Sequence, residues 1–148
     1  MKKGFSVIEI LIVIGIIGVL SAVAVVNFNG SKITKIRQIT TNNIVFALEK
    51  QKSFAEAGKG GLSQGIKFDE NSYTTFSGSS YNASDLTNET LEIDSNIGIS
   101  VEGATSSVIF SRITGDVGGA STITIYEKND VTKKTTITIG SLGDISVL

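Results

Sequence analysis

Near its N-terminus the sequence contains an apolar stretch that a small soluble protein could not satisfy by itself. From Gly4 to Val26 the only charged side chain is Glu9, and Ile10 to Leu20 is unbroken apolar sequence. As an α-helix rising ~1.5 Å per residue, the stretch would be roughly 34 Å long, about the thickness of a bilayer's hydrocarbon core. We therefore predict a helix that requires lipid, or other protein chains, around it.

Three interpretations of this stretch compete. The first is a plain membrane anchor, preceded by the basic residues Lys2 and Lys3. The second is a secretory signal peptide, because Ala22-Val23-Ala24 has the small-x-small form that signal peptidase reads. The third is a short basic leader that is cut off inside the apolar block.

Glu9 distinguishes among these interpretations. A carboxylate within a membrane-spanning helix costs about 2.5–3.5 kcal/mol on insertion scales, and such residues are usually functional. Neither an anchor nor a disposable signal peptide needs a carboxylate at this position. The third interpretation is therefore favoured.

The residues around Glu9, Lys2-Lys3-Gly4-Phe5-Ser6-Val7-Ile8-Glu9, resemble the start of type IV prepilins and type II secretion pseudopilins. The resemblance extends without a gap to about Ala24. It implies that a prepilin peptidase cuts between Gly4 and Phe5 and that the new N-terminus, Phe5, is methylated. It also implies that the Glu9 carboxylate neutralises the α-amine of Phe5 on a neighbouring subunit during assembly.

Beyond the apolar stretch the pattern becomes amphipathic. Apolar side chains recur at near-helical spacing with charged residues between them, and the pattern fades at Ala57-Gly58, before the glycines Gly60 and Gly61. We predict one long helix from Phe5 to Ala57, softened at Asn27 to Gly30. Its second half should be apolar along one stripe.

The remaining residues are typical of short strands separated by Gly, Asn and Asp. The interval Tyr73 to Asn88, rich in Ser and Asn, is predicted to be a surface loop. The clearest strands are Thr122–Tyr126 and Thr136–Ile139, joined as a hairpin with Asn129-Asp130 in the turn. Further strands are predicted at 91–93, 97–101 and 107–113.

Together these elements predict an α+β fold, in which the long N-terminal helix packs on a C-terminal antiparallel β-sheet. This is also the pilin architecture, and a weaker resemblance points to H-type minor pseudopilins and related minor pilins. It rests on Ile109-Phe110 with Gly115 downstream, the two Thr/Ile strands, and Gly143-Asp144-Ile145. The predicted organisation is a leader (1–4), a membrane-spanning and assembly segment (5–26), an amphipathic helix (27–57) and a β-rich head (58–148).

Composition argues against an enzyme. The 148 residues include no Cys, His, Trp or Pro, which excludes disulfides, Cys/His zinc sites and His-assisted nucleophiles. We predict no cofactor and no metal. Clustered acids between Asp69 and Glu102 could suggest calcium, but they lack EF-hand spacing and are better interpreted as a solvated face.

The charge balance argues against nucleic acid as a partner. The net charge is −1, and the nearest basic candidate, Lys133-Lys134, is typical of a pair that blunts an edge strand.

The sequence therefore predicts a structural subunit of a type IV filament, either a pilus or a secretion pseudopilus. Its partners would be prepilin peptidase, other pilin or pseudopilin subunits, and membrane lipid before assembly. It would begin as a single-pass precursor in the inner membrane and end in a periplasmic or extracellular filament. The alternative is a secreted or membrane-tethered β-rich binding module whose helix is only an anchor or a signal peptide.

Overall fold

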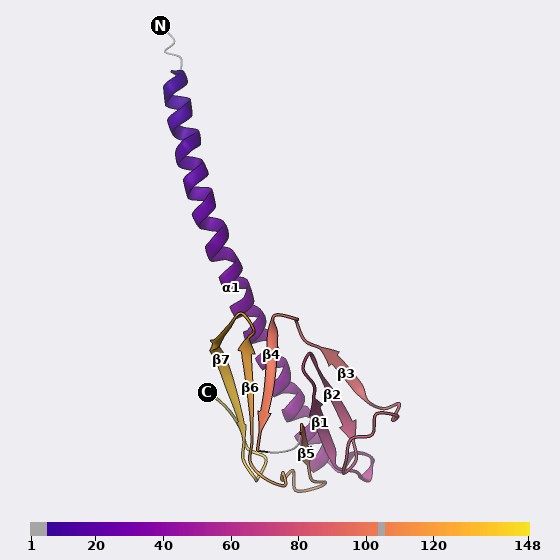
Figure 1. The fold of residues 1–148 in the computed structure, drawn as a ribbon. Coiled ribbons are helices and arrows are strands. Elements are labelled where there is room, and N and C mark those ends of the chain that lie inside the picture. Colours follow the sequence, from indigo (N-terminus) through magenta and orange to yellow (C-terminus); the bar gives the residue numbers. More distant parts are fainter. Residues whose placement is uncertain (1–5, 104–105) are drawn as a thin grey trace. The chain divides into compact units, whose positions relative to one another are not determined.

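A computed structural model describes residues 6–103 and 106–148, without the side chains of 22–31 (Figure 1). Its contacts divide the chain into two compact units, Met1–Lys35 and Ile36–Leu148. We call the second unit the head. Helix α1, Val7–Glu56, contributes to both units.

The described residues of the first unit belong almost entirely to α1. The side chains from Ser6 to Ser21 are all exposed, including eleven large apolar ones whose exposed fractions lie between 49% and 76%. No helix among the described residues has both the length and the hydropathy that crossing a membrane requires. The predicted leader, 1–4, and the predicted softening at Asn27 to Gly30 fall on residues or side chains that are not described.

In the head, α1 buries one stripe of its surface. Ile44, Leu48 and Ala55 are fully buried and recur at helical spacing, as the amphipathic pattern predicts. The helix ends one residue before the predicted Ala57. Gly58 follows in the left-handed conformation (φ 65°), which glycine adopts without a steric penalty at a helix C-terminus.

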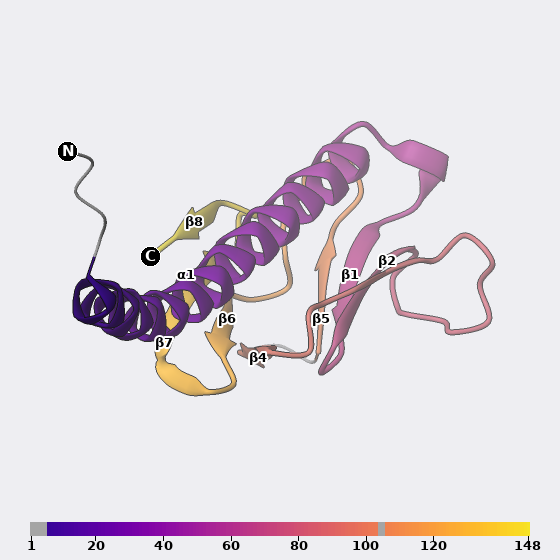
Figure 2. The ribbon, with the colours of Figure 1, turned by 90° about the horizontal axis from the view of Figure 1, so that it is seen from above.

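The strands of the head form two antiparallel four-stranded sheets. One has the order β3-β2-β1-β5 and the other β4-β6-β7-β8 (Figures 1 and 2). The strands of the first sheet are β1 (Gln64–Phe68), β2 (Ser72–Ser77), β3 (Glu89–Glu92) and β5 (Ser107–Phe110). Those of the second are β4 (Ile97–Glu102), β6 (Ser121–Glu127), β7 (Asp130–Ile139) and β8 (Ile145–Val147).

The predicted Thr/Ile hairpin forms, but β7 begins at Asp130 and not at Thr136, so the turn consists of Lys128 and Asn129. Strand β6 alternates buried and half-buried residues along its whole length, and it pairs with β7 so that Ile123 lies opposite Ile137. The isoleucines of both strands are buried, so this hairpin supplies much of the core. The predicted packing of the helix on an antiparallel sheet is confirmed.

Part of the predicted surface loop Tyr73 to Asn88 is wrong, because its first five residues belong to β2. This strand pairs with β1 on one side and β3 on the other, and four consecutive residues from Tyr73 to Phe76 are buried. A strand that is buried on both faces shows no alternation of apolar and polar residues. The threonines of β2 also make the segment resemble a polar loop in the sequence. The threonines are accommodated by hydrogen bonds such as that between the Oγ1 atoms of Thr74 and Thr90 (2.9 Å).

Strands β1 and β8 were not predicted, and β5 is shorter than the predicted 107–113. A glycine interrupts β1 at Gly65. Gly65 lies opposite Phe76 on β2, and a Cβ at Gly65 would lie 2.5 Å from the Phe76 ring. The glycine therefore permits the aromatic side chain to cover the strand. Strand β5 ends at Phe110, and Ile113 lies beyond it with φ 75°.

Candidate functional site

Of the predicted processing and assembly residues, the structure describes only Glu9, which lies in the first turn of α1. The Ser6 carbonyl accepts hydrogen bonds from the amides of Glu9 (3.1 Å) and Ile10 (3.3 Å), so Ser6 occupies the N-cap position. The Glu9 Oε2 accepts a hydrogen bond from the Ser6 amide at 3.5 Å. Gly4 and Phe5 lie outside the described residues.

This arrangement is half of a capping box, in which a Glu three residues after the N-cap accepts from the N-cap amide. The Ser6-x-x-Glu9 spacing is the sequence signal for this box, and Ser6 was not among the predicted functional residues. The positive end of the helix dipole also favours a carboxylate in the first turn. The hydrogen bond is long and exposed, so the Glu9 carboxylate lies near the N-terminus of the helix and is accessible to a cation.

The apolar residues after Glu9 surround the helix completely. Val7, Leu11 and Ile14 are as exposed as their neighbours on the opposite face, so α1 has no preferred buried side in this region. A helix that is apolar all round requires lipid or other helices as its environment. The chemistry of this segment is therefore association, with one carboxylate at its start.

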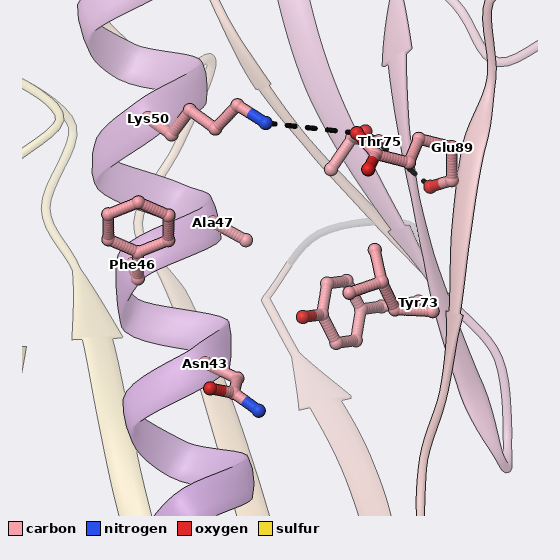
Figure 3. Close-up of a pocket in the computed structure, with 8 residues that line it drawn as sticks. Asn43, Phe46, Ala47, Lys50, Tyr73, Thr75 and Glu89 are labelled. Atoms are coloured by element: carbon pink, nitrogen blue, oxygen red, sulfur yellow. Dashed lines mark hydrogen bonds and ion pairs between the residues drawn. The ribbon is translucent and has the colours of Figure 1, made fainter.

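In the head, a cavity of about 260 Å³ opens between α1 and the first sheet (Figure 3). Ala47, the half-exposed Lys50 and the exposed Phe46 line it from α1, and Tyr73 faces them from β2. Lys50 Nζ lies 3.7 Å from Glu89 Oε2 at the cavity. Burial raises the pKa of the Tyr73 hydroxyl, and the negative charge of Glu89 adds to this effect.

One buried ion pair joins α1 to the second sheet. Arg37 Nε donates to Glu127 Oε1 at 3.3 Å, and Arg37 Nη1 donates to the hydroxyl of Thr135. The Glu127 side chain is only 4% exposed, since it continues the buried side of β6. The pair links the β6–β7 hairpin to the helix.

The acidic residues between Asp69 and Glu102, for which calcium was considered and a solvated face predicted, take separate partners. Asp69 pairs with Lys67, Glu70 with Lys128 and Glu89 with Lys50. Asp85 accepts hydrogen bonds from the amide and hydroxyl of Thr87, which lower its pKa. Within residues 6–103 and 106–148, no three acidic side chains are placed to hold a metal ion.

Comparison with known proteins agrees with this geometry. Residues 1–25 match the family model of the prokaryotic N-terminal methylation motif. A search of curated protein sequences found no match.

Two solved proteins share the fold. The minor pseudopilin EpsH from the type 2 secretion system of Vibrio cholerae is 15% identical, with a TM-score of 0.58 over 75% of this chain and 94% of that one. The type IV minor pilin FimU of Pseudomonas aeruginosa is 13% identical, with a TM-score of 0.60 over 75% of this chain and 91% of that one. A second crystal form of FimU gives a TM-score of 0.61.

The predicted resemblance to prepilins and pseudopilins is thus confirmed. The chain combines the prokaryotic N-terminal methylation motif, in residues 1–25, with the fold of minor pseudopilins and minor pilins.

Proposed function

We propose that this chain is a structural subunit of a type IV filament, either a pilus or a type II secretion pseudopilus. The observation that carries the proposal is a coincidence of two independent features. A methylation motif occupies residues 1–25, and the fold is that of minor filament subunits. A secreted binding module that used its helix only as an anchor would need neither the motif nor the Glu9 carboxylate.

Processing would occur between Gly4 and Phe5. Glycine has no side chain, so the backbone at Gly4 can approach the peptidase closely. Cleavage would leave Phe5 as the methylated N-terminus, next to the N-cap residue Ser6. The new α-amine would therefore lie immediately before the first turn of α1.

Assembly would then use Glu9. Before assembly the carboxylate interacts with its own helix terminus through the exposed hydrogen bond to Ser6. In a bundle of apolar helices, the α-amine of a neighbouring Phe5 would offer a full positive charge in a water-poor environment, where opposite charges attract strongly. Each charge would offset part of the other's desolvation cost.

Lipid would surround the apolar helix before assembly, and neighbouring helices would replace the lipid afterwards. The precursor would be a single-pass protein of the inner membrane with its head outside the cytoplasm. Its partners would be prepilin peptidase and other pilin or pseudopilin subunits. The chain acts by association and not as an enzyme.

The peptidase reaction tests this proposal directly. The full chain, reconstituted in detergent with a prepilin peptidase, should lose Met1 to Gly4 and no other residues, as measured by intact mass. Gly4→Leu should remain uncut because its side chain obstructs the approach. Gly18→Leu is the matched control, since a Cβ at Gly18 meets no atom within 4 Å, and this variant should be cut normally. A wild-type chain that keeps its full mass would contradict the prepilin assignment.

A further inference from the structure

The cavity between α1 and the first sheet brings one face of the helix opposite one face of the sheet (Figure 3). On α1, Asn43, Phe46 and Lys50 follow one another at intervals of three and four residues, so they share a face of the helix. On the sheet, Tyr73 of β2 lies opposite Leu91 of β3, and such cross-strand pairs also share a face. The cavity thus has one wall from the helix and one from the sheet.

The Tyr73 hydroxyl is the most informative group in this cavity. The residue is only 4% exposed, and its oxygen is directed toward α1 in Figure 3. Within residues 6–103 and 106–148 no side chain or backbone group forms a hydrogen bond with this hydroxyl, although a phenol can both donate and accept one. Because buried polar groups normally have partners, this hydroxyl is available to a molecule that enters the cavity.

Other hydrogen-bonding groups surround the same space. The exposed Asn43 side chain carries both donors and an acceptor. Lys50 Nζ and Glu89 Oε2 lie 3.7 Å apart near the surface, so their ion pair contributes little and both groups can bond to a ligand. These residues add donors and acceptors to the cavity but no net charge.

Apolar surface completes the lining. Phe46 is 67% exposed although it belongs to the head, and the exposed Leu91 lies on the side of the sheet. An aromatic ring has a negative face, against which the slightly positive C–H groups of a ligand pack favourably. Phe46 therefore offers a platform at the cavity.

This combination of groups selects a class of ligand. A purely apolar ligand would leave the Tyr73 hydroxyl unpaired, which costs free energy. A ligand with a net charge would be repelled by either Lys50 or Glu89. A neutral ligand with several hydroxyl groups and one apolar face satisfies every group, and pyranose sugars have this structure. The cavity, at about 260 Å³, is smaller than the roughly 300–1,000 Å³ of drug-sized sites, so it suits a single ring.

We propose that this cavity binds one neutral pyranose ring, with the apolar face of the sugar on Phe46 and its hydroxyl groups bonded to Tyr73 and Asn43. A free monosaccharide and the terminal unit of a glycan both carry such a ring. Binding requires neither cleavage after Gly4 nor assembly, so it stands or falls separately from the filament role.

Fluorine NMR of the full chain measures this binding. The chain contains only three tyrosines, so labelling with 3-fluorotyrosine gives three signals, and Tyr73→Phe identifies the signal of Tyr73. The chain is kept in a detergent without a sugar headgroup and titrated with glucose, galactose, mannose and N-acetylglucosamine. At least one sugar should shift the Tyr73 signal and leave that of Tyr126, on β6, in place. The dissociation constant should be on the order of 1 mM, because so small a ligand makes few contacts.

Variants at the cavity test the individual contacts, with binding measured by saturation transfer from the protein to the sugar. Phe46→Ala should abolish binding, whereas Phe46→Tyr retains the aromatic platform and should preserve it. Tyr73→Phe removes one hydrogen bond and should weaken binding about three- to tenfold. Tyr126→Phe is the matched control, since it removes a hydroxyl outside the cavity, and it should bind like the wild type. In the cavity variants an unchanged Tyr126 signal shows that the head is folded.

Methyl glycosides distinguish the two sources of the ring. Binding of a methyl glycoside as tight as that of the free sugar supports the terminal unit of a glycan, and loss of binding on methylation supports a free monosaccharide.

Two results would overturn the proposal. One is the absence of any Tyr73 shift with all four sugars at concentrations far above 1 mM, and the other is equal binding by Phe46→Ala and the wild type. A Tyr73 shift with glutamate but with none of the sugars would overturn the ligand class. None of these results bears on the filament role, which the peptidase reaction tests.

Discussion

Leu11 and Leu48 are both leucines of α1, yet the first is 61% exposed and the second is completely buried. From Ile10 to Leu20 every side chain is apolar and exposed, so this part of the helix has no face that the described residues of its own chain cover. Around Leu48 apolar and polar residues alternate at helical spacing, and the head covers the apolar stripe. One helix thus has an exposed apolar segment and a segment that packs in the head. The spacing of polar residues along the sequence distinguishes the two segments.

This contrast shows that burial within one chain requires a pattern as well as hydrophobicity. The segment 6–21 is more apolar than the helix stripe of the head, yet none of its side chains is buried in the described structure.

Glu9→Leu should abolish entry into filaments while the variant still inserts in the membrane and is still cut after Gly4. The substitution removes the only carboxylate of the apolar segment, so nothing attracts the incoming α-amine. The measurement is an immunoblot of sheared and membrane fractions. Glu49→Leu, at an exposed position of the same helix, should assemble normally, and undiminished assembly of Glu9→Leu would refute the role assigned to Glu9.

Leu48→Ala should lower the free energy of unfolding of the head by about 2–5 kcal/mol, because it leaves a cavity in the core. Leu11→Ala removes the same atoms from an exposed position and should leave head stability unchanged within about 0.5 kcal/mol. Chemical denaturation of the full chain in detergent, followed by the near-ultraviolet signal of the head tyrosines, measures both. Similar losses for the two variants would show that the first unit also packs on the head.

Glu127→Gln should cost about 1.5–3 kcal/mol, because Arg37 would lose its charged partner in a buried environment. Glu49→Gln, at an exposed position, should cost almost nothing. The same denaturation experiment compares them. Equal stability of Glu127→Gln and the wild type would mean that the ion pair is not what fixes the hairpin on α1.

Tyr73→Phe should change the pH dependence of stability in alkali. Burial and then Glu89 raise the pKa of the folded-state hydroxyl, so the unfolded chain ionises first as the pH rises. Tyr73 therefore contributes stability below its ordinary pKa of 10.0, and this contribution is lost as the pH rises through the folded-state value. Urea melts between about pH 8 and 11 should show a steeper decline for wild type than for Tyr73→Phe, and parallel declines would contradict the shift.

The threonine-rich segments show where sequence reasoning reached its limit. The β6–β7 hairpin was predictable because its Thr/Ile alternation matches a sheet with one buried face. The β2 strand was missed because both of its faces are covered and Thr74 and Thr75 occupy buried positions. Their hydrogen-bond partners, Thr90 and Glu89, lie on β3, which follows an eleven-residue loop. No local sequence pattern predicts the pairing of β2 with β3.

The sequence by itself determined the parts of this protein that depend on local order. A few neighbouring residues suffice to predict each of these features. They are the Gly4-Phe5 junction, the Glu9 spacing, the apolar stretch and the helix end near Gly58. Only the tertiary structure decided which charges meet. Arg37 and Glu127 are 90 residues apart in the chain, yet their side chains pair across the head. Contacts of such long range are set by how the sheets pack on the helix, which the spacing of residues along the chain does not specify.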